Sequence, residues 1–293
     1  MINILLTLDK KYVQHLHVML VSLFENNKER NFVVYIFSDN LSTETQNEVQ
    51  ELSNQYKQNI VFYDLNIDDI QHFNISNHAS LANYYRIIAC KLLPQNIRQI
   101  LYMDVDLLVL KNIKTLYSIN LESNLLGVIS EVGKMEEQKK ILNIPNDKQY
   151  FNSGIMLINL KKWQDEKWTE KLINYINQNP DKLMFWDQDA LNAMCYGQCI
   201  YLDNKWNMQA TMFENNKDSK QNFQNTAIMH FTGSSKPWQY MNKHPYKYLY
   251  YQYLKKTIFK NFVPPDKTIG NFLRKYKLMP KIYDKLSKKI NKA

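Results

Sequence analysis

The sequence predicts an α/β protein with a largely parallel central sheet and helices on both of its faces. Strand-like and helix-like runs alternate along the first hundred residues, which is the order that builds such sheets. At 293 residues, 45% of them hydrophobic, the chain is long enough to bury one large core. Its apolar runs are far shorter than a membrane span, so we expect a globular protein.

The predicted elements follow from hydrophobic period and end signals. In the first half the strand candidates are 2–8, 32–39, 59–65 and 98–110. The helix candidates there are 12–26, 43–56 and 79–93. Ser42 or Thr43 is expected to cap the second helix, and Pro94 to stop the third. Further along, 125–130 and 154–160 have a strand pattern, and 187–195 has the pattern of a helix.

Two carboxylates interrupt the fourth strand candidate, RQILYMDVDLLVL. Asp104 and Asp106 stand between two apolar runs, where an unpaired buried charge would cost several kcal/mol. They are therefore expected at an exposed strand end, where α/β sheets bind ligands, or beside a cation. In a strand, residues i and i+2 point to the same side, so the pair would form half of a Mg²⁺ or Mn²⁺ site. By itself this D-x-D spacing fits a pair of solvated loop acids better, and DQD at 187–189 repeats it.

Glycine-rich phosphate loops are missing from the chain. Its six glycines are too dispersed for G-x-G-x-x-G or G-x-x-x-x-G-K, which disfavours a Rossmann dehydrogenase or a P-loop NTPase. A bound diphosphate would have to be neutralised by a metal and by side chains. The segment HFTGSSKPW offers an imidazole at His230, a glycine where backbone can approach a ligand, and the cation of Lys236. Cys195 and Cys199 have C-x₃-C spacing but lack a four-ligand zinc pattern, so a metal site there is disfavoured.

Six segments in order resemble glycosyltransferase family 8, the retaining group that includes lipopolysaccharide galactosyl- and glucosyltransferases and, more distantly, glycogenin. The segments are LLTLDKKY, HASLANYYR, LYMDVDLLVL, YFNSGIMLINLKKW, WDQDALN and HFTGSSKPW. The resemblance runs from about residue 2 to residue 238. It implies a single-domain, Rossmann-like GT-A fold for a catalytic domain at 1–261. It also implies transfer of galactose or glucose from a UDP-sugar to an oligosaccharide, with a lipopolysaccharide or lipooligosaccharide core as the expected acceptor.

At matching positions the resemblance implies roles for three sets of residues. Contacts to the nucleotide are implied for Thr7, Asp9, Tyr12, His78, Ala79, Asp104, Val105, Asp106, Ser153, Gly233 and Lys236. Mn²⁺, with Mg²⁺ as the alternative, is implied to bind Asp104, Asp106 and His230. The donor sugar and the reaction are implied to involve Arg86, Asn152, Asp187 and Gln188, with Ser153 also beside the sugar. Lys11 departs from the bacterial members that the chain resembles, which carry Asn there, so one ribose or uracil contact of the family is not implied for this chain.

Rival interpretations come from other functional classes. A non-catalytic sugar-nucleotide or glycan-binding protein of the same fold would not need the D-x-D pair, His230 and Lys236. A nucleotidylyltransferase would need a glycine-rich basic loop after the first strand, and TLDKKY has no glycine. A UDP-sugar hydrolase is compatible with all of these residues, and an acceptor assay is needed to exclude it.

The C-terminal segment, 262–293, differs in charge from the rest of the chain. It holds eight lysines and one arginine against two aspartates, a net +7 of the chain's +9. Apolar residues recur at helical spacing in 268–277 and again at Ile282, Leu286 and Ile290. Such basic amphipathic helices bind anionic lipid surfaces, although a solvated tail packed on the domain is the alternative. Because MINILLTLDKK lacks a basic leader, we expect a cytoplasmic protein. The basic segment predicts that it is peripheral at the inner face of the cell membrane. We expect no nucleic-acid partner.

Overall fold

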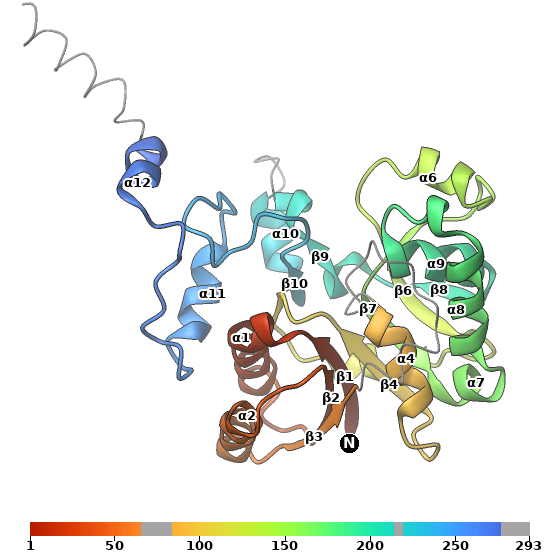
Figure 1. Cartoon of the computed structure of the whole chain (residues 1–293), viewed down its shortest axis with the longest axis horizontal. Helices are drawn as coiled ribbons and strands as arrows, with labels where there is room; N and C mark the ends of the chain where they lie inside the picture. Colours follow the sequence, from red (N-terminus) through yellow and green to blue (C-terminus); the bar gives the residue numbers. More distant parts are fainter. Residues whose placement is uncertain (66–83, 214–218, 277–293) are drawn as a thin grey trace, which may run out of the picture.

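The computed structural model describes residues 1–65, 84–213 and 219–276. Its main feature is a seven-stranded sheet in the order β3-β2-β1-β4-β7-β6-β8 (Figure 1). In that order the strands are Asn59–Asp64, Phe32–Ser38, Ile2–Leu8, Gln99–Met103, Phe151–Asn159, Leu126–Ser130 and Cys199–Tyr201. A three-stranded sheet, β5-β10-β9, consists of Leu107–Val109, Ile228–His230 and Met208–Gln209.

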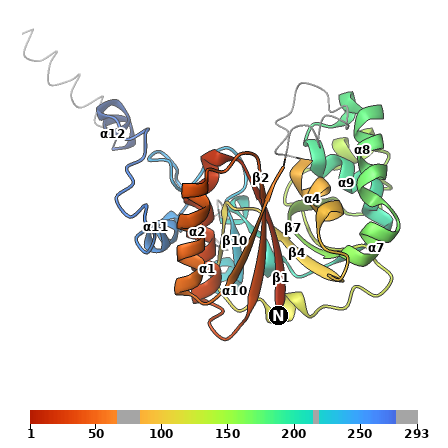
Figure 2. The ribbon, with the colours of Figure 1, turned by 60° about the horizontal axis from the view of Figure 1, so that its bottom comes forward.

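Helices lie against both faces of the large sheet (Figure 2). Those of the first half are α1 (Val13–Glu25), α2 (Thr43–Gln55), α4 (Tyr85–Leu92) and α5 (Lys114–Tyr117). The second half of the chain forms the helices α6 (Glu136–Ile141), α7 (Leu160–Asp165), α8 (Trp168–Gln178), α9 (Trp186–Cys195), α10 (Ser219–Asn225), α11 (Lys247–Leu254) and α12 (Ile269–Lys275), of which α12 lies away from the sheet. Short 3₁₀ turns are η1 (Lys10–Tyr12), η3 (Pro180–Lys182), η4 (Tyr196–Gln198), η5 (Asn204–Trp206) and η6 (Ala210–Phe213).

Alternation along β1 shows why both faces are covered. Ile4 and Leu6 belong to a hydrophobic cluster with residues of α1 and α2, whereas Leu5 belongs to a second cluster with residues of α4, α8 and α9. The side chains of Ile4, Leu5 and Leu6 are fully buried. Successive strand residues point to opposite faces, so a strand buried on both faces is apolar at nearly every position. The α/β class and the two helix layers are therefore confirmed.

The sheet is mixed, although most of its strand pairs are parallel. β1 is parallel to β2 and β4, β2 to β3, and β6 to β8. β7 is antiparallel to both of its neighbours, β4 and β6. Eight of the nine residues of β7 are buried, and such an apolar run has the same pattern in either direction. Periodicity could therefore predict this strand but not its orientation.

The prediction of one strand over 98–110 was wrong. The chain forms β4 in the large sheet, bends at 104–106, and continues as β5 in the small sheet. At the bend the backbone changes partners: the Asp104 N–H donates to Gly154 O of β7 at 2.8 Å, and the Phe231 N–H donates to Asp106 O at 3.1 Å. Apolar residues flank the bend on both sides because each half is buried in a different sheet.

Other predicted boundaries agree closely with the structure. Ser42 caps α2, its Oγ accepting from the Thr45 N–H at 3.2 Å. The helix predicted at 79–93 is α4 in its second part, and 79–83 lies outside the described residues. In the C-terminal segment α12 matches the first predicted helix, and its apolar Ile269, Phe272 and Tyr276 are exposed. The second predicted helix, with Ile282, Leu286 and Ile290, lies outside the described residues.

Candidate active site

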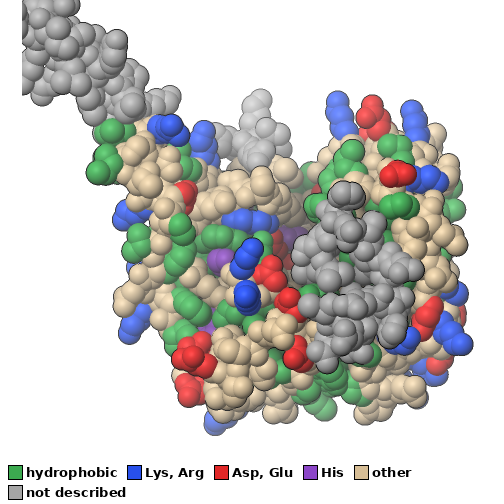
Figure 3. All heavy atoms as spheres, viewed as in Figure 1, with side chains coloured by type: hydrophobic (Ala, Val, Ile, Leu, Met, Phe, Trp, Pro, Cys, Tyr) green, Lys and Arg blue, Asp and Glu red, His purple; other side chains and the backbone are tan. Residues whose placement is uncertain are grey.

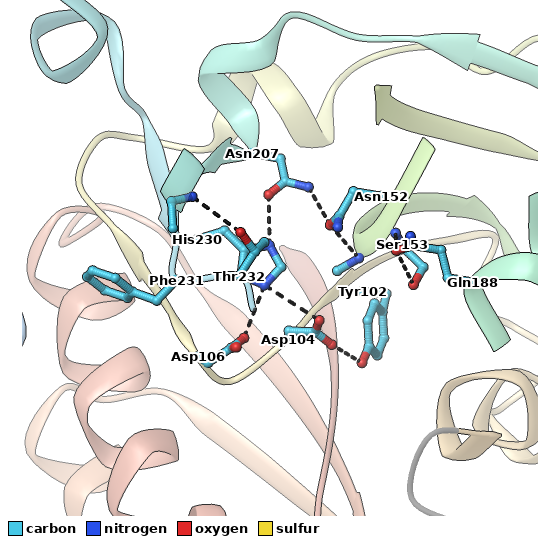
Figure 4. Close-up of polar contacts among 12 residues, drawn as sticks. Tyr102, Asp104, Asp106, Asn152, Ser153, Gln188, Asn207, His230, Phe231 and Thr232 are labelled. Carbon is cyan, nitrogen blue, oxygen red and sulfur yellow. Dashed lines mark hydrogen bonds and ion pairs between the residues drawn. The ribbon is translucent and has the colours of Figure 1, made fainter. Parts of the chain in front are cut away.

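The bend at 104–106 brings the two carboxylates beside His230. The small sheet explains this placement, because β10 pairs with β5 and sets His230 opposite Leu107. His230 Nε2 lies 3.1 Å from Asp106 Oδ1 and 3.7 Å from Asp104 Oδ2 (Figure 4). Asp104 and Asp106 were expected on one side of a strand, but they lie in a bend that also brings them together. Both carboxylates face one imidazole nitrogen.

These three residues could hold a metal ion. One ligand atom from each of Asp104, Asp106 and His230 lies within 4.8 Å of the others. Two carboxylates and one neutral imidazole form a donor set that suits Mn²⁺ and accommodates Mg²⁺. Among the described residues, no second group of this kind was found. In the C-x₃-C segment the Cys199 thiol instead donates to the Cys195 carbonyl at 3.0 Å, and burial raises the pKa of both thiols.

Gly154 makes this close arrangement sterically feasible. A Cβ on this residue would lie 2.2 Å from His230 Cε1 and 2.7 Å from Asp104 Oδ2. Atoms of real side chains do not approach so closely, so any larger residue would push the ligands apart. The backbone of Gly154 also accepts from the Asp104 N–H. The site therefore requires a residue without a side chain at position 154.

Two cations compensate the carboxylates. The Arg86 guanidinium lies 3.2 Å from Asp104 Oδ1 and 2.9 Å from Asp187 Oδ2, and Lys236 Nζ forms an ion pair with Asp106. Burial would raise the pKa of the Asp106 carboxyl, but the ammonium group of Lys236 outweighs burial and holds that pKa well below its usual range. Of the two alternatives expected for the acidic pair, the neighbouring cation is the one that the structure shows, because both carboxylates follow a strand end but are largely buried.

Asp187 is the second carboxylate paired with Arg86, through Nε of the guanidinium, whereas Asp104 contacts Nη2. It is buried in the first turn of α9, and burial raises its pKa to about 6 although Arg86 opposes the shift. Asp189, from the same DQD segment, has a structural role. It accepts from the Tyr150 hydroxyl at 2.6 Å, from Gln138 at 2.8 Å and from the Phe185 N–H at the start of α9 at 2.6 Å. This last bond resembles the return bond of a capping box.

Asp187 should make stability depend on pH. Its pKa in the folded state lies above the ordinary value near 4 of an unfolded aspartate, so the folded state binds this proton more tightly. The resulting stabilisation, about 3 kcal/mol, is complete below pH ~4 and is lost as the pH rises through about 6. In urea unfolding, the stability of the wild type relative to Asp187→Asn should therefore fall between pH 4 and pH 7 and stay constant above. A difference that is the same at every pH would contradict this assignment.

An unpredicted carboxylate, Glu131, bonds to both Asn152 and Gln188, and Ser153 bonds to Gln188. Asn152 donates to Glu131 Oε2 at 2.8 Å, and Gln188 donates to the same oxygen at 3.2 Å. Gln188 Oε1 accepts from the Ser153 N–H at 3.0 Å, and Ser153 O accepts from Arg86 at 2.8 Å. Glu131 directly follows β6, so the strand-end argument used for Asp104 would also have found it.

Most predicted site residues line one cleft of about 1160 Å³. They are Arg86, Asp104, Asp106, Asn152, Ser153, Asp187, Gln188, His230, Gly233 and Lys236. In the space-filling view the hollow has acidic and histidine side chains at its floor (Figure 3). Gly233 lines it with a φ of +80° and open space around its Cα, so backbone is accessible there.

The predicted nucleotide-binding residues in and after β1, and Val105, are not among those lining this cleft. Thr7 is buried and bonds to the Tyr102 hydroxyl at 3.1 Å, and that hydroxyl donates to Asp104 Oδ1 at 2.6 Å. Asp9 caps η1 by accepting from the Lys11 N–H at 2.7 Å. The Tyr12 ring meets the Trp238 ring edge to face at 6.0 Å. Val105, between the two carboxylates, is buried in the core. His78 and Ala79 lie outside the described residues.

Comparison with known proteins shows the family of this chain. The family profile described as glycosyl transferase family 8 matches residues 3–242, which is most of the chain. The chain belongs to glycosyltransferase family 8. This membership confirms the resemblance inferred from the six sequence segments and makes the protein an enzyme, a hexosyltransferase.

Relatives of this family 8 chain cover nearly its whole length. General stress protein A of Bacillus subtilis (strain 168) is 33% identical over 276 residues, covering 90% of this chain and 94% of that protein. Lipopolysaccharide 1,2-glucosyltransferase of Escherichia coli (strain K12) is 29% identical over 286 residues, covering 94% and 84%. The crystal structure of galactosyltransferase LgtC with donor and acceptor sugar analogues matches with a TM-score of 0.77 at 24% identity, covering 90% and 98%. This last similarity confirms the predicted GT-A type of fold. Within the described part of this family 8 chain, every helix is too short or too polar to cross a bilayer.

Proposed function

We propose that this family 8 enzyme is a retaining glycosyltransferase that moves galactose or glucose from a UDP-sugar to an oligosaccharide. The proposed acceptor is a lipopolysaccharide or lipooligosaccharide core, and the name of its Escherichia coli relative includes lipopolysaccharide. The observation that carries the proposal is the Asp104–Asp106–His230 group at one end of a large cleft, with Lys236 beside it. A diphosphate needs such neutralisation in a site that lacks a glycine-rich loop.

The residues of the cleft support a division of labour. Asp104, Asp106 and His230 would hold Mn²⁺, or alternatively Mg²⁺, which when bound supplies positive charge to the departing diphosphate. Lys236 would exchange its ion pair with Asp106 for a contact to the leaving phosphate and neutralise it as the bond to the sugar breaks. Gly233 would allow backbone to approach the same phosphates. Thr7, Asp9, Tyr12, Val105, His78 and Ala79 stay predictions for the uracil and ribose.

The sugar would lie between α9 and the start of β7. Asp187 and Arg86, linked at 2.9 Å, would accept from and donate to its hydroxyl groups, together with Asn152 and Ser153. The acceptor hydroxyl would attack from the face that UDP leaves and pass its proton to a phosphate oxygen. Attack from that face retains the anomeric configuration. Gln188 would stabilise the opposite face, since the Ser153 N–H and Glu131 hold its amide in place.

The C-terminal segment would attach the catalytic domain, 1–261, to a membrane carrying the acceptor. Ile269, Phe272 and Tyr276 expose 82%, 46% and 56% of their surface, next to Arg274 and Lys275. Apolar side chains flanked by cations suit an anionic lipid surface. We therefore propose a cytoplasmic enzyme, peripheral at the inner face of the cell membrane.

Release of UDP from a panel of sugar nucleotides, without acceptor, tests the proposed reaction. We expect slow release from one hexose donor in the presence of Mn²⁺ and its loss in EDTA. The favoured donor would distinguish UDP-galactose from UDP-glucose. Addition of core oligosaccharide should then accelerate release, whereas no acceleration would favour a UDP-sugar hydrolase. Absence of both release and Mn²⁺-dependent UDP binding would favour a non-catalytic binding protein.

A further inference from the structure

Asn207 lies in the core of the site, although neither the sequence motifs nor the cleft lining points to it. It follows η5 and precedes β9, the strand that pairs with β10 beside His230. Its side chain is fully buried and makes two hydrogen bonds (Figure 4). Oδ1 lies 2.9 Å from His230 Nδ1, and Nδ2 donates to Asn152 Oδ1 at 2.8 Å.

Backbone groups determine the direction of each of these bonds. Asn152 Oδ1 accepts from the Gly154 N–H at 3.0 Å, so this atom is the oxygen of the amide. The atom of Asn207 that faces it must therefore be the NH₂ group, which leaves Oδ1 to face the imidazole. A carbonyl oxygen only accepts, so the proton of His230 lies on Nδ1. His230 Nε2 then presents its lone pair to Asp104 and Asp106.

The same chain of bonds continues from Asn152 to Glu131 and Gln188. Asn152 donates to Glu131 Oε2, which also accepts from Gln188. The Ser153 N–H in turn specifies that Gln188 Oε1 is the acceptor in that amide. Asn207 is therefore the first link between the imidazole and the amide proposed to face the sugar.

We infer that Asn207 is a positioning residue that selects the metal-binding tautomer of His230 and couples it to the orientation of Gln188. The inference builds on the proposed function. Without the Asn207 oxygen, the imidazole can place its proton on Nε2 and donate it to Asp106 Oδ1, 3.1 Å away. That bond would occupy both groups and exclude a metal ion. Partners that orient a ligand histidine in this way typically contribute about 10–100-fold to metal affinity.

Two substitutions separate the two bonds. Asn207→Leu removes both. Asn207→Asp keeps an oxygen for His230 Nδ1–H but cannot donate to Asn152 when ionised. A matched control is Asn27→Leu, because Asn27 is equally buried and also makes two bonds, to Leu23 O and the Ile113 N–H, far from the site.

The tautomer is measured from the imidazole ¹⁵N spectrum of the metal-free protein at pH 8, in which the His230 signals are assigned by their absence in His230→Gln. Mn²⁺ affinity is then measured by titration monitored by electron paramagnetic resonance. Wild type should show the Nδ1–H tautomer. Asn207→Leu should shift it to Nε2–H and weaken Mn²⁺ binding about tenfold or more. Asn207→Asp should keep the tautomer and bind Mn²⁺ at least as tightly, while its maximal rate of UDP release falls about tenfold. Asn27→Leu should lose stability alone.

The inference is overturned if Asn207→Leu keeps the wild-type tautomer and Mn²⁺ affinity, or if Asn207→Asp loses as much affinity as the leucine variant. Should Asn207→Leu not fold, the aspartate variant still decides the second point. If wild type binds no Mn²⁺, the proposed metal-dependent function fails, and the tautomer of the metal-free protein still shows whether Asn207 orients His230.

Discussion

Asp104→Asn is expected to lower Mn²⁺-dependent release of UDP by about a hundredfold or more. The substitution replaces a charged ligand by a neutral amide and leaves the size of the side chain almost unchanged. Asn at this position still accepts from the Tyr102 hydroxyl, which is 2.6 Å from the present oxygen. Arg86 loses one carboxylate and keeps its ion pair with Asp187. The fold should therefore survive while the metal affinity and the reaction are lost.

Kinetics of UDP release, Mn²⁺ binding and thermal unfolding together check this result. Asp147→Asn is a matched control, because the side chain of Asp147 is 74% exposed and pairs with Lys148 on the surface. It should leave all three quantities unchanged. Unchanged activity in Asp104→Asn would show that the Asp104–Asp106–His230 group is not the metal site.

Gly154→Ala should inactivate the enzyme as effectively as loss of a ligand. The added methyl would lie 2.2 Å from His230 Cε1 and 2.9 Å from His230 Nδ1, so the imidazole has to leave its position. Overpacking of this kind costs about 1–3 kcal/mol in a well-packed interior. The φ of Gly154 is outside the left-handed region, so alanine is acceptable to the backbone and the effect is steric. We expect Mn²⁺ affinity and UDP release to fall by about a hundredfold each, as for a displaced ligand.

Gly197→Ala separates this steric effect from a general effect of replacing glycine. No atom lies within 4 Å of the position that its Cβ would occupy. Activity and Mn²⁺ binding should stay at wild-type levels. The steric account of Gly154 is wrong if Gly154→Ala binds Mn²⁺ as tightly as the wild type does.

Sequence patterns predicted those parts of the site that obey local rules. Asp104 follows a strand, as ligand-binding residues of α/β sheets do, and Lys236 stands in a segment with glycine and histidine. Glu131 obeys the same strand-end rule and was still missed, since one acid after an apolar run is a weak signal. Tyr102 gave no signal because it has the pattern of a core residue, and indeed it is fully buried while its hydroxyl bonds to Asp104.

The sequence by itself determined the α/β class, the position of most of the strands and helices it predicted, and the chemical types of most residues in the candidate site. These properties depend on hydrophobic period, capping residues and side-chain chemistry, all of which act over a few neighbouring residues. Only the tertiary structure decided that β7 runs antiparallel, that 98–110 divides between two sheets, and that Gly154 and Asn207 adjoin His230. His230 and Asp106 are separated by 124 residues. Contacts over such distances depend on how buried strands pair, and the apolar run of a buried strand specifies neither its partner nor its direction.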